Sequence, residues 1–196
     1  THQNNNMEER DINPAESLSI IQSMVNKTQR QYSDDSFYYI MWGWLALAAA
    51  LAHFVLLKMD IEQAPVVWLL MPVGGIVSMI YGAKQSKKEK IKTYVSTYMG
   101  YLWSAMEVAM VVTLSMMFKL GVENTYPILI LIYGIGTFVS GGLLSFRPLI
   151  IGGIICFVLS VVAFFVTFQI QLLFIAGAML VSYIIPGHLL KAKFSN

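Results

Sequence analysis

The chain has 196 residues, of which 57% are hydrophobic and only 12% are charged, and its formal net charge is +2. A soluble domain carries about 25% charged residues, and the strands of a membrane β-barrel alternate between apolar and polar side chains. Here the apolar residues form long uninterrupted runs. The composition therefore excludes an ordinary soluble domain and predicts an all-α, polytopic membrane protein. The small net charge gives no reason to expect a nucleic-acid partner.

An amphipathic helix is predicted at residues 14–32, within an N-terminal segment that covers residues 1–35. Residues 13–16 (Asn-Pro-Ala-Glu) combine an N-cap, a proline at the first helical position and a capping-box acid. Apolar and aromatic side chains then recur on one helical face, at Leu18, Ile21, Val25 and Tyr32. We expect the helix to end at residues 33–36. It either lies on the membrane surface or docks under the bundle, or it binds a cytoplasmic protein partner or a second copy of itself.

Six apolar segments follow, each about 20 residues long, which is enough to cross roughly 30 Å of hydrocarbon as a helix. These predicted membrane helices cover residues 37–57, 66–83, 98–120, 128–146, 149–168 and 172–190. The predicted turns include residues 121–127, 147–148 and 169–171. The bundle would occupy residues 36–191 and be followed by a tail at 192–196. Small residues recur at related places in alternate helices, which indicates either three repeated hairpins or the general abundance of glycine in membrane helices.

The distribution of basic residues predicts the orientation. With six spans, 11 of the 13 Lys and Arg residues lie on the side of the N-terminus, and only Lys58 and Lys119 lie on the other side. The positive-inside rule then places both termini in the cytoplasm. The densest cluster is a topology determinant and is also expected to contact anionic lipid headgroups. It consists of Lys84, Lys87, Lys88, Lys90 and Lys92.

Glu107 is the one acidic residue inside any of the apolar runs. A carboxyl group at membrane depth is costly and normally faces the bundle interior or a wet cavity, so we expect neighbouring helices to enclose it. It is either a proton-linked or cation-binding site, or a protonated group that hydrogen-bonds across helices as packing. By depth, its candidate partners are Tyr133, Tyr183 and Ser104. His53, about 9 Å nearer the outer face, either pairs with Glu107 through water or lies at the interface.

No catalytic motif is found, and no enzyme activity, cofactor or metal site is predicted. The chain has a single cysteine, Cys156, and no HExxH sequence. Ser140-Gly141 and His188 invite comparison with rhomboid proteases, in which a serine is activated by a histidine. That pattern has a glycine two residues before the serine, and here the position is Phe138. An intramembrane hydrolase is therefore a weak hypothesis.

Residues 16–44 pair the amphipathic segment with an aromatic Trp-Gly-Trp sequence at residues 42–44. This stretch resembles a group of small, uncharacterised bacterial inner-membrane proteins with six helices. The resemblance implies a bacterial inner-membrane location and carries no functional residue.

Two hypotheses of function follow from the sequence. In the first, the protein is a small transporter, channel-like or ligand-binding bundle with a cavity near Glu107. In the second, it is a regulatory or scaffolding membrane protein that recruits a cytoplasmic partner through helix 14–32. Glycine-rich helix faces add the hypothesis of a homo-oligomer.

Overall fold

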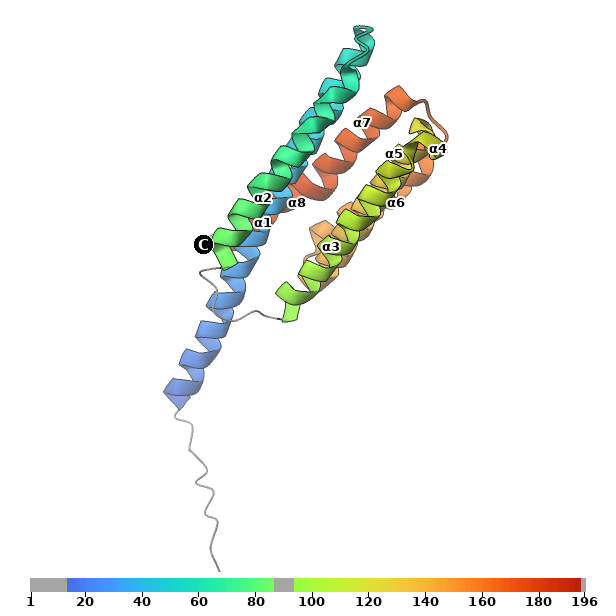
Figure 1. Ribbon diagram of the computed structural model, residues 1–196. Helices are drawn as coiled ribbons and strands as arrows, with labels where there is room; N and C mark the ends of the chain where they lie inside the picture. The colour runs from blue at the N-terminus through green and yellow to red at the C-terminus, as the bar shows by residue number, and fades with distance from the viewer. Residues whose placement is uncertain (1–13, 87–93, 195–196) are drawn as a thin grey trace, which may run out of the picture.

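The computed structural model describes the backbone of residues 14–86 and 94–194 (Figure 1). Every regular element in these two ranges is helical, which confirms the all-α prediction. In chain order they are α1 (Pro14–Lys58), the 3₁₀ helix η1 (Ala64–Leu69), α2 (Leu70–Ser86), α3 (Tyr94–Ser115), α4 (Met117–Leu120), α5 (Val122–Leu143), α6 (Arg147–Ala163), α7 (Phe168–Met179), the π-helix η2 (Leu180–Ile184) and α8 (Ile185–Phe194).

Four stretches are long and apolar enough to cross a membrane, so the chain is built as a membrane protein. They are Ser36–Lys58, Ala64–Lys84, Val122–Leu143 and Phe168–Lys193. The other two predicted spans fall short for different reasons. Helix α6 is apolar but has only 17 residues. Helix α3 has 22 residues, but Glu107 and several Tyr and Ser residues make it less apolar.

Helix α1 is continuous, so the predicted break at residues 33–36 is wrong. The helix runs for 45 residues, which corresponds to about 68 Å and is twice the thickness of a hydrocarbon core. The sequence at the expected break is Ser-Asp-Asp-Ser. These residues are only mediocre helix formers, but no glycine or proline forces a stop. The first half of α1 therefore projects beyond the other helices (Figure 1).

The later turns lie at other positions than predicted. Residues 122–127 belong to α5, with Pro127 inside the helix, because Gly121 makes the turn in a left-handed conformation (φ 78°) that favours glycine. Arg147 and Pro148 open α6, where proline suits the first turn. Residues 169–171 lie in α7, and the connection that precedes them is residues 164–167.

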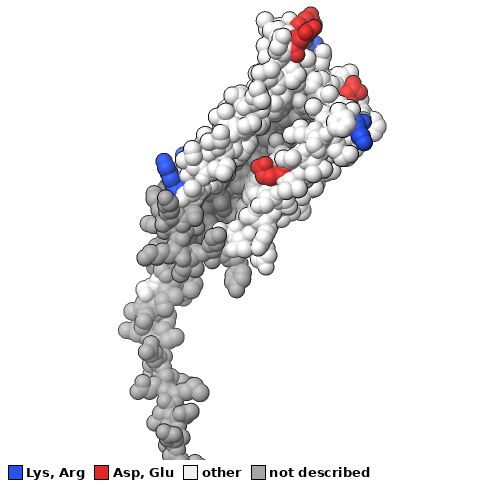
Figure 2. All heavy atoms as spheres, viewed as in Figure 1, with Lys and Arg blue, Asp and Glu red and all other residues white. Residues whose placement is uncertain are grey.

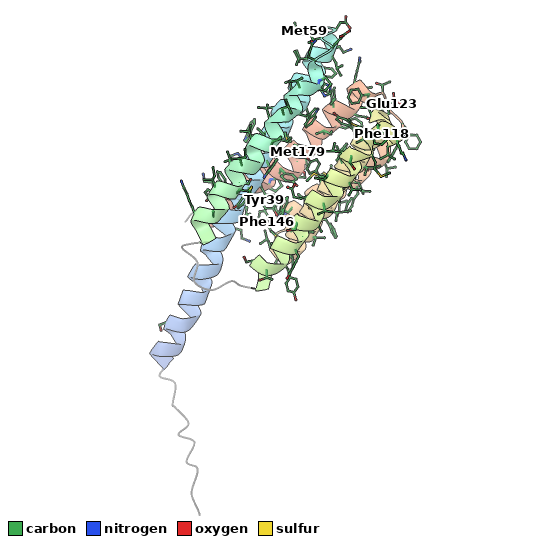
Figure 3. The ribbon with its side chains drawn as sticks, in the orientation of Figure 1. Tyr39, Met59, Phe118, Glu123, Phe146 and Met179 are labelled. Carbon is green, nitrogen blue, oxygen red and sulfur yellow. The ribbon has the colours of Figure 1, made fainter. Side chains whose placement is uncertain are left out.

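The helices form two groups joined by the last helical stretch (Figure 1). The first group is α1, η1 and α2; the second is α3, α4, α5 and α6. The stretch α7–η2–α8 packs on α1 from one side and on α5 and α6 from the other. We call the end of the molecule that holds Met59, Phe118 and Glu123 the distal end (Figure 3). The opposite end, where α5 connects to α6, is the proximal end.

Gln171 holds the distal end of the second group together. Its Nε2 donates hydrogen bonds to the carbonyl oxygens of Glu123 (2.8 Å) and Ala163 (2.9 Å). The Glu123 carbonyl needs this donor because Pro127, four residues later, has no backbone N–H. The Ala163 carbonyl is at the end of α6, where backbone acceptors lack partners within the helix. One fully buried side chain thus completes the backbone bonding of two helices.

Replacing Gln171 with Met should lower the free energy of unfolding by about 2–6 kcal/mol, since two carbonyl groups lose their donor at about 1–3 kcal/mol each. Thermal unfolding of the purified protein in nanodiscs measures this. Gln169→Met is the matched control, because Gln169 is exposed two residues away in the same helix. Equal losses of stability in the two variants would contradict the role assigned to Gln171.

Candidate functional site

Four aromatic rings connect the two helix groups near the proximal side; we call them the proximal bridge. Tyr39 of α1 lies 5.8 Å from Trp103 of α3 and 5.7 Å from Tyr183 of η2, measured between ring centroids. Tyr133 of α5 lies 5.8 Å from Tyr183. The backbones of α1 and α3 do not approach each other, so these large side chains make the connection.

Tyr183 is placed by an irregular piece of helix. The π-helix η2 ends just before Pro186, which lacks the backbone N–H that a regular helix requires. Two glycines let neighbouring helices approach this segment closely. A Cβ atom at Gly43 of α1 would lie 2.9 Å from the Cβ of Tyr183, and one at Gly152 of α6 would lie 2.7 Å from the Cα of Ser182. Single π-turns of this kind are frequent at functional sites.

The phenol group of Tyr183 is buried without a hydrogen-bond partner. The side chain is 1% exposed, and no described residue donates to or accepts from its hydroxyl. A buried polar group of this kind is unusual and needs an explanation, such as water or a ligand.

Glu107 lies near the middle of α3 and is exposed, so the prediction that neighbouring helices enclose it is wrong. Among the described elements the backbone of α3 approaches only those of α4 and α5, while α2 stays on the first group, so no helix covers this carboxylate. Glu107 follows Trp103 by one helical turn and shares its face. It interacts electrostatically with Tyr133 and Tyr183.

A second set of aromatic side chains closes the distal end; we call it the distal bridge. Trp68 of η1 lies 6.0 Å from Tyr126 of α5, which lies 5.0 Å from Phe168 of α7. The surface is hollowed along the gap between α2 and α3, and an acidic group lies on one side of this gap (Figure 2). We call this the hollow. No contact between α2 and α3 closes its side.

No basic side chain lies at the depth of Glu107 in the described residues. Each Lys or Arg whose side chain the structure describes lies at a helix end or next to a connection: Lys58, Lys84, Lys119, Arg147, Lys191 and Lys193. None of the described residues forms an ion pair or a hydrogen bond with Glu107. The carboxylate therefore faces the hollow without an internal counter-ion.

The structure brings two of the four predicted partners to Glu107 and separates the other two. Tyr133 and Tyr183 are within electrostatic reach. Ser104 is exposed and donates to the carbonyl oxygen of Gly100 in its own helix (2.8 Å). His53 belongs to the distal bridge, where its Nδ1 accepts a hydrogen bond from Trp68 Nε1 (2.9 Å). The sequence analysis did not place Trp103 or Tyr39 at the site, although both residues belong to aromatic runs in the sequence.

The remaining candidates do not form a site in the described residues. Lys84 is exposed at the end of α2, whereas Lys87, Lys88, Lys90 and Lys92 lie outside the described residues. Ser140 is buried in α5 and His188 is exposed on α8, and these helices do not contact each other. No group of three or more His, Cys, Asp or Glu side chains in the described ranges could hold a metal ion.

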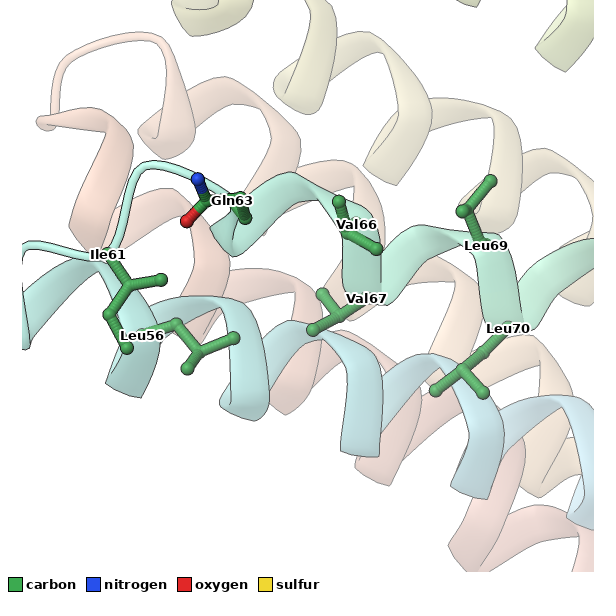
Figure 4. A pocket seen from close by; sticks show the side chains of 7 residues that line it. All are labelled: Leu56, Ile61, Gln63, Val66, Val67, Leu69 and Leu70. Atoms are coloured by element: carbon green, nitrogen blue, oxygen red, sulfur yellow. The ribbon is translucent and has the colours of Figure 1, made fainter.

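Two shallow recesses lie on the first helix group and are almost wholly apolar. The one in Figure 4 is formed where α1 meets η1 and is lined by Leu56, Ile61, Gln63, Val66, Val67, Leu69 and Leu70. The second lies between α1 and α2. Neither has an acidic or basic lining residue, so both suit lipid chains better than a polar ligand.

Comparisons with protein families, with curated proteins and with solved structures find no match to this chain. The resemblance of residues 16–44 to small bacterial inner-membrane proteins stays a prediction. The function must therefore be argued from the geometry of the hollow.

The hydrogen bond between His53 and Trp68 predicts a measurable coupling of the two residues. A double-mutant cycle with His53→Phe and Trp68→Phe should give a coupling of about 0.5–1.5 kcal/mol in the free energy of unfolding, because either single change removes the bond. A cycle of His53→Phe with Glu107→Gln should be additive to within about 0.5 kcal/mol. If the cycle of His53→Phe with Glu107→Gln gives the larger coupling, His53 belongs to the site of Glu107 and not with Trp68.

Proposed function

We propose that the chain is a six-span protein of a bacterial-type cytoplasmic membrane, with both termini in the cytoplasm. The four long apolar stretches support this, together with α3 and α6, which run alongside them (Figure 1). The cytoplasmic assignment of the proximal end rests on the uneven distribution of Lys and Arg along the sequence. Lys84 at that end is then positioned for anionic headgroups.

This topology predicts which residues a membrane-impermeant thiol reagent can reach. Cys156→Ala removes the single cysteine of the chain. In that background Glu62→Cys, in the distal connection, should be labelled in intact cells, because it faces outward. Ser145→Cys, in the proximal connection between α5 and α6, should be labelled only after the membrane is permeabilised. The reverse pattern would overturn the orientation.

The protein's function in this proposal is to bind a small cationic ligand in the hollow and to move it as a small transporter. The observation that carries it is the position of Glu107: a carboxylate at mid-helix, exposed to the hollow, beside Tyr133 and Tyr183 and without a basic partner in the described residues. An ionisable group at membrane depth is by default a candidate functional group. A structural carboxyl would instead be expected to hydrogen-bond across a helix interface.

The arrangement of the helices suits movement of a ligand. The two groups meet through aromatic side chains at the two bridges and through α7–η2–α8, while α2 and α3 remain apart. Rigid-body rocking of one helix group against another around a fixed site is how many small transporters give alternating access. The π-helix η2, which carries Tyr183, lies between the two helix groups, so rocking of one group against the other would displace it.

The decisive variant is Glu107→Gln, which keeps the shape of the side chain and removes its charge. A bound cation at 100 times its Kd should stabilise the wild-type protein by about 2.7 kcal/mol, and the variant should lose this stabilisation. Thermal unfolding in nanodiscs, with a panel of inorganic and organic cations, measures it. Glu123→Gln is the matched control, because Glu123 is exposed at the distal end and should leave the response unchanged.

One observation favours the second hypothesis, a scaffold that recruits a cytoplasmic partner. The first half of α1 projects beyond the bundle, and Leu18 on it is 63% exposed. If Glu107→Gln leaves a cellular phenotype intact while deletion of residues 1–33 abolishes it, the result supports recruitment of a partner and the transporter proposal fails.

A further inference from the structure

We infer that the ligand of the hollow is an amphiphilic organic ammonium ion that reaches Glu107 sideways from the bilayer, between α2 and α3. The inference rests on the proposed function and specifies the ligand class of the same site. It follows from three properties of the hollow: its charge, its aromatic walls and its opening.

The charge of the site calls for a cation from outside the bundle. No described residue forms an ion pair or a hydrogen bond with Glu107, and the Lys and Arg side chains that the structure describes lie at the helix ends. Ionisable groups at membrane depth are normally paired with another group. The ligand therefore carries a positive charge.

The donor set of the site does not suit a metal ion. Calcium takes six to eight oxygen ligands and magnesium a near-ideal octahedron. The site offers the carboxylate of Glu107 and the phenol hydroxyls of Tyr133 and Tyr183, and the hydroxyl of Ser104 already donates to the carbonyl oxygen of Gly100. The described residues contain no cluster of acidic, histidine or cysteine side chains that could complete a metal shell.

The aromatic walls suit an ammonium ion with carbon substituents. Trp103 and Tyr133 are only partly buried, and both lie against the ring of Tyr183, at 6.3 Å and 5.8 Å between centroids. Cations placed over the face of a tryptophan or tyrosine are attracted by the ring, and quaternary ammonium groups are commonly recognised in this way.

The opening of the hollow faces the hydrocarbon region rather than either aqueous side. Aromatic contacts of the proximal bridge and the distal bridge link the two helix groups toward either end of the hollow, and no contact between α2 and α3 closes its side. Val73, Ile76 and Ile80 on α2 and Val108 and Val111 on α3 are each more than half exposed, so both helices present apolar side chains at the surface. A ligand with an apolar tail can partition into the bilayer and present its cationic head to Glu107 (Figure 2).

The test uses the full-length protein in phosphatidylcholine nanodiscs and four probes. Benzyl(hexyl)dimethylammonium has the charge, the ring and the tail. Its uncharged carbon isostere, in which carbon replaces nitrogen, lacks only the charge. Tetramethylammonium lacks the apolar arms, and sodium chloride supplies an inorganic cation. Titration calorimetry should give a Kd for the first probe about tenfold or more below the Kd values of the other three.

Two variants with matched controls assign the binding to the hollow. Glu107→Gln and Trp103→Leu should each weaken binding of benzyl(hexyl)dimethylammonium about tenfold or more. Glu123→Gln and Trp44→Leu should leave it unchanged, since Glu123 lies at the distal end and Trp44 is 51% exposed on α1 outside the hollow. If Trp103→Leu fails to fold, the comparison of the charged probe with its isostere on wild-type protein still decides the question.

The outcomes separate this inference from the proposal on which it rests. Equal affinity of wild-type protein for the ammonium ion and its uncharged isostere, or unchanged binding in Glu107→Gln, overturns the ligand class. If Glu107→Gln then still removes a stabilisation by sodium or another inorganic cation, the proposed function stands with a different ligand. If Glu107→Gln behaves like Glu123→Gln for every cation, both fail.

Discussion

The fold depends on one constraint of the bilayer, which is that backbone polar groups must find partners inside the protein. Gln171 supplies such a partner at the distal end, where two backbone carbonyl groups have no donor within their own helices. Pro127 deprives the Glu123 carbonyl of its donor, α6 ends at Ala163, and the side-chain amide of Gln171 bonds to both carbonyls. Tyr126 precedes Pro127, and Phe168 precedes Gln171 by one turn. The same bonds therefore position two rings of the distal bridge.

A second irregularity positions the other end of the hollow. The π-helix η2 before Pro186 carries Tyr183, and the absence of a side chain at Gly43 and Gly152 lets α1 and α6 approach it from two sides. Tyr183 then contacts the rings of Tyr39, Trp103 and Tyr133, which come from three different helices. The helix groups are thus joined by aromatic contacts at two levels, and Glu107 lies just beyond the proximal one.

Electrostatics give this arrangement its functional meaning. The described basic side chains gather at the helix ends, where water or headgroups solvate them, and the carboxylate of Glu107 stands alone at mid-helix. Because a lone charge at membrane depth is costly, Glu107 is the residue on which the proposed cation site rests. The partly buried rings beside it extend the site from a point charge to a surface that can bind a carbon-bearing cation.

The sequence alone determined the membrane class, the helical fold and the prominence of Glu107, because apolar runs and an isolated carboxyl group are local properties of the chain. It also pointed to Tyr133 and Tyr183, which share the depth of Glu107. The continuity of α1 and the true turns at Gly121 and residues 164–167 were not predicted. Polar residues such as Gln171 indicate a turn in the sequence, because their hydrogen bonds to distant carbonyl groups become known only from the structure. Only the tertiary structure decided that His53 belongs with Trp68, that Ser104 bonds to its own helix and that Glu107 faces an open hollow. These outcomes depend on which helices pack together. The apolar surfaces of the helices are similar, so their packing is determined by the combined shape of many side chains and not by any local sequence pattern.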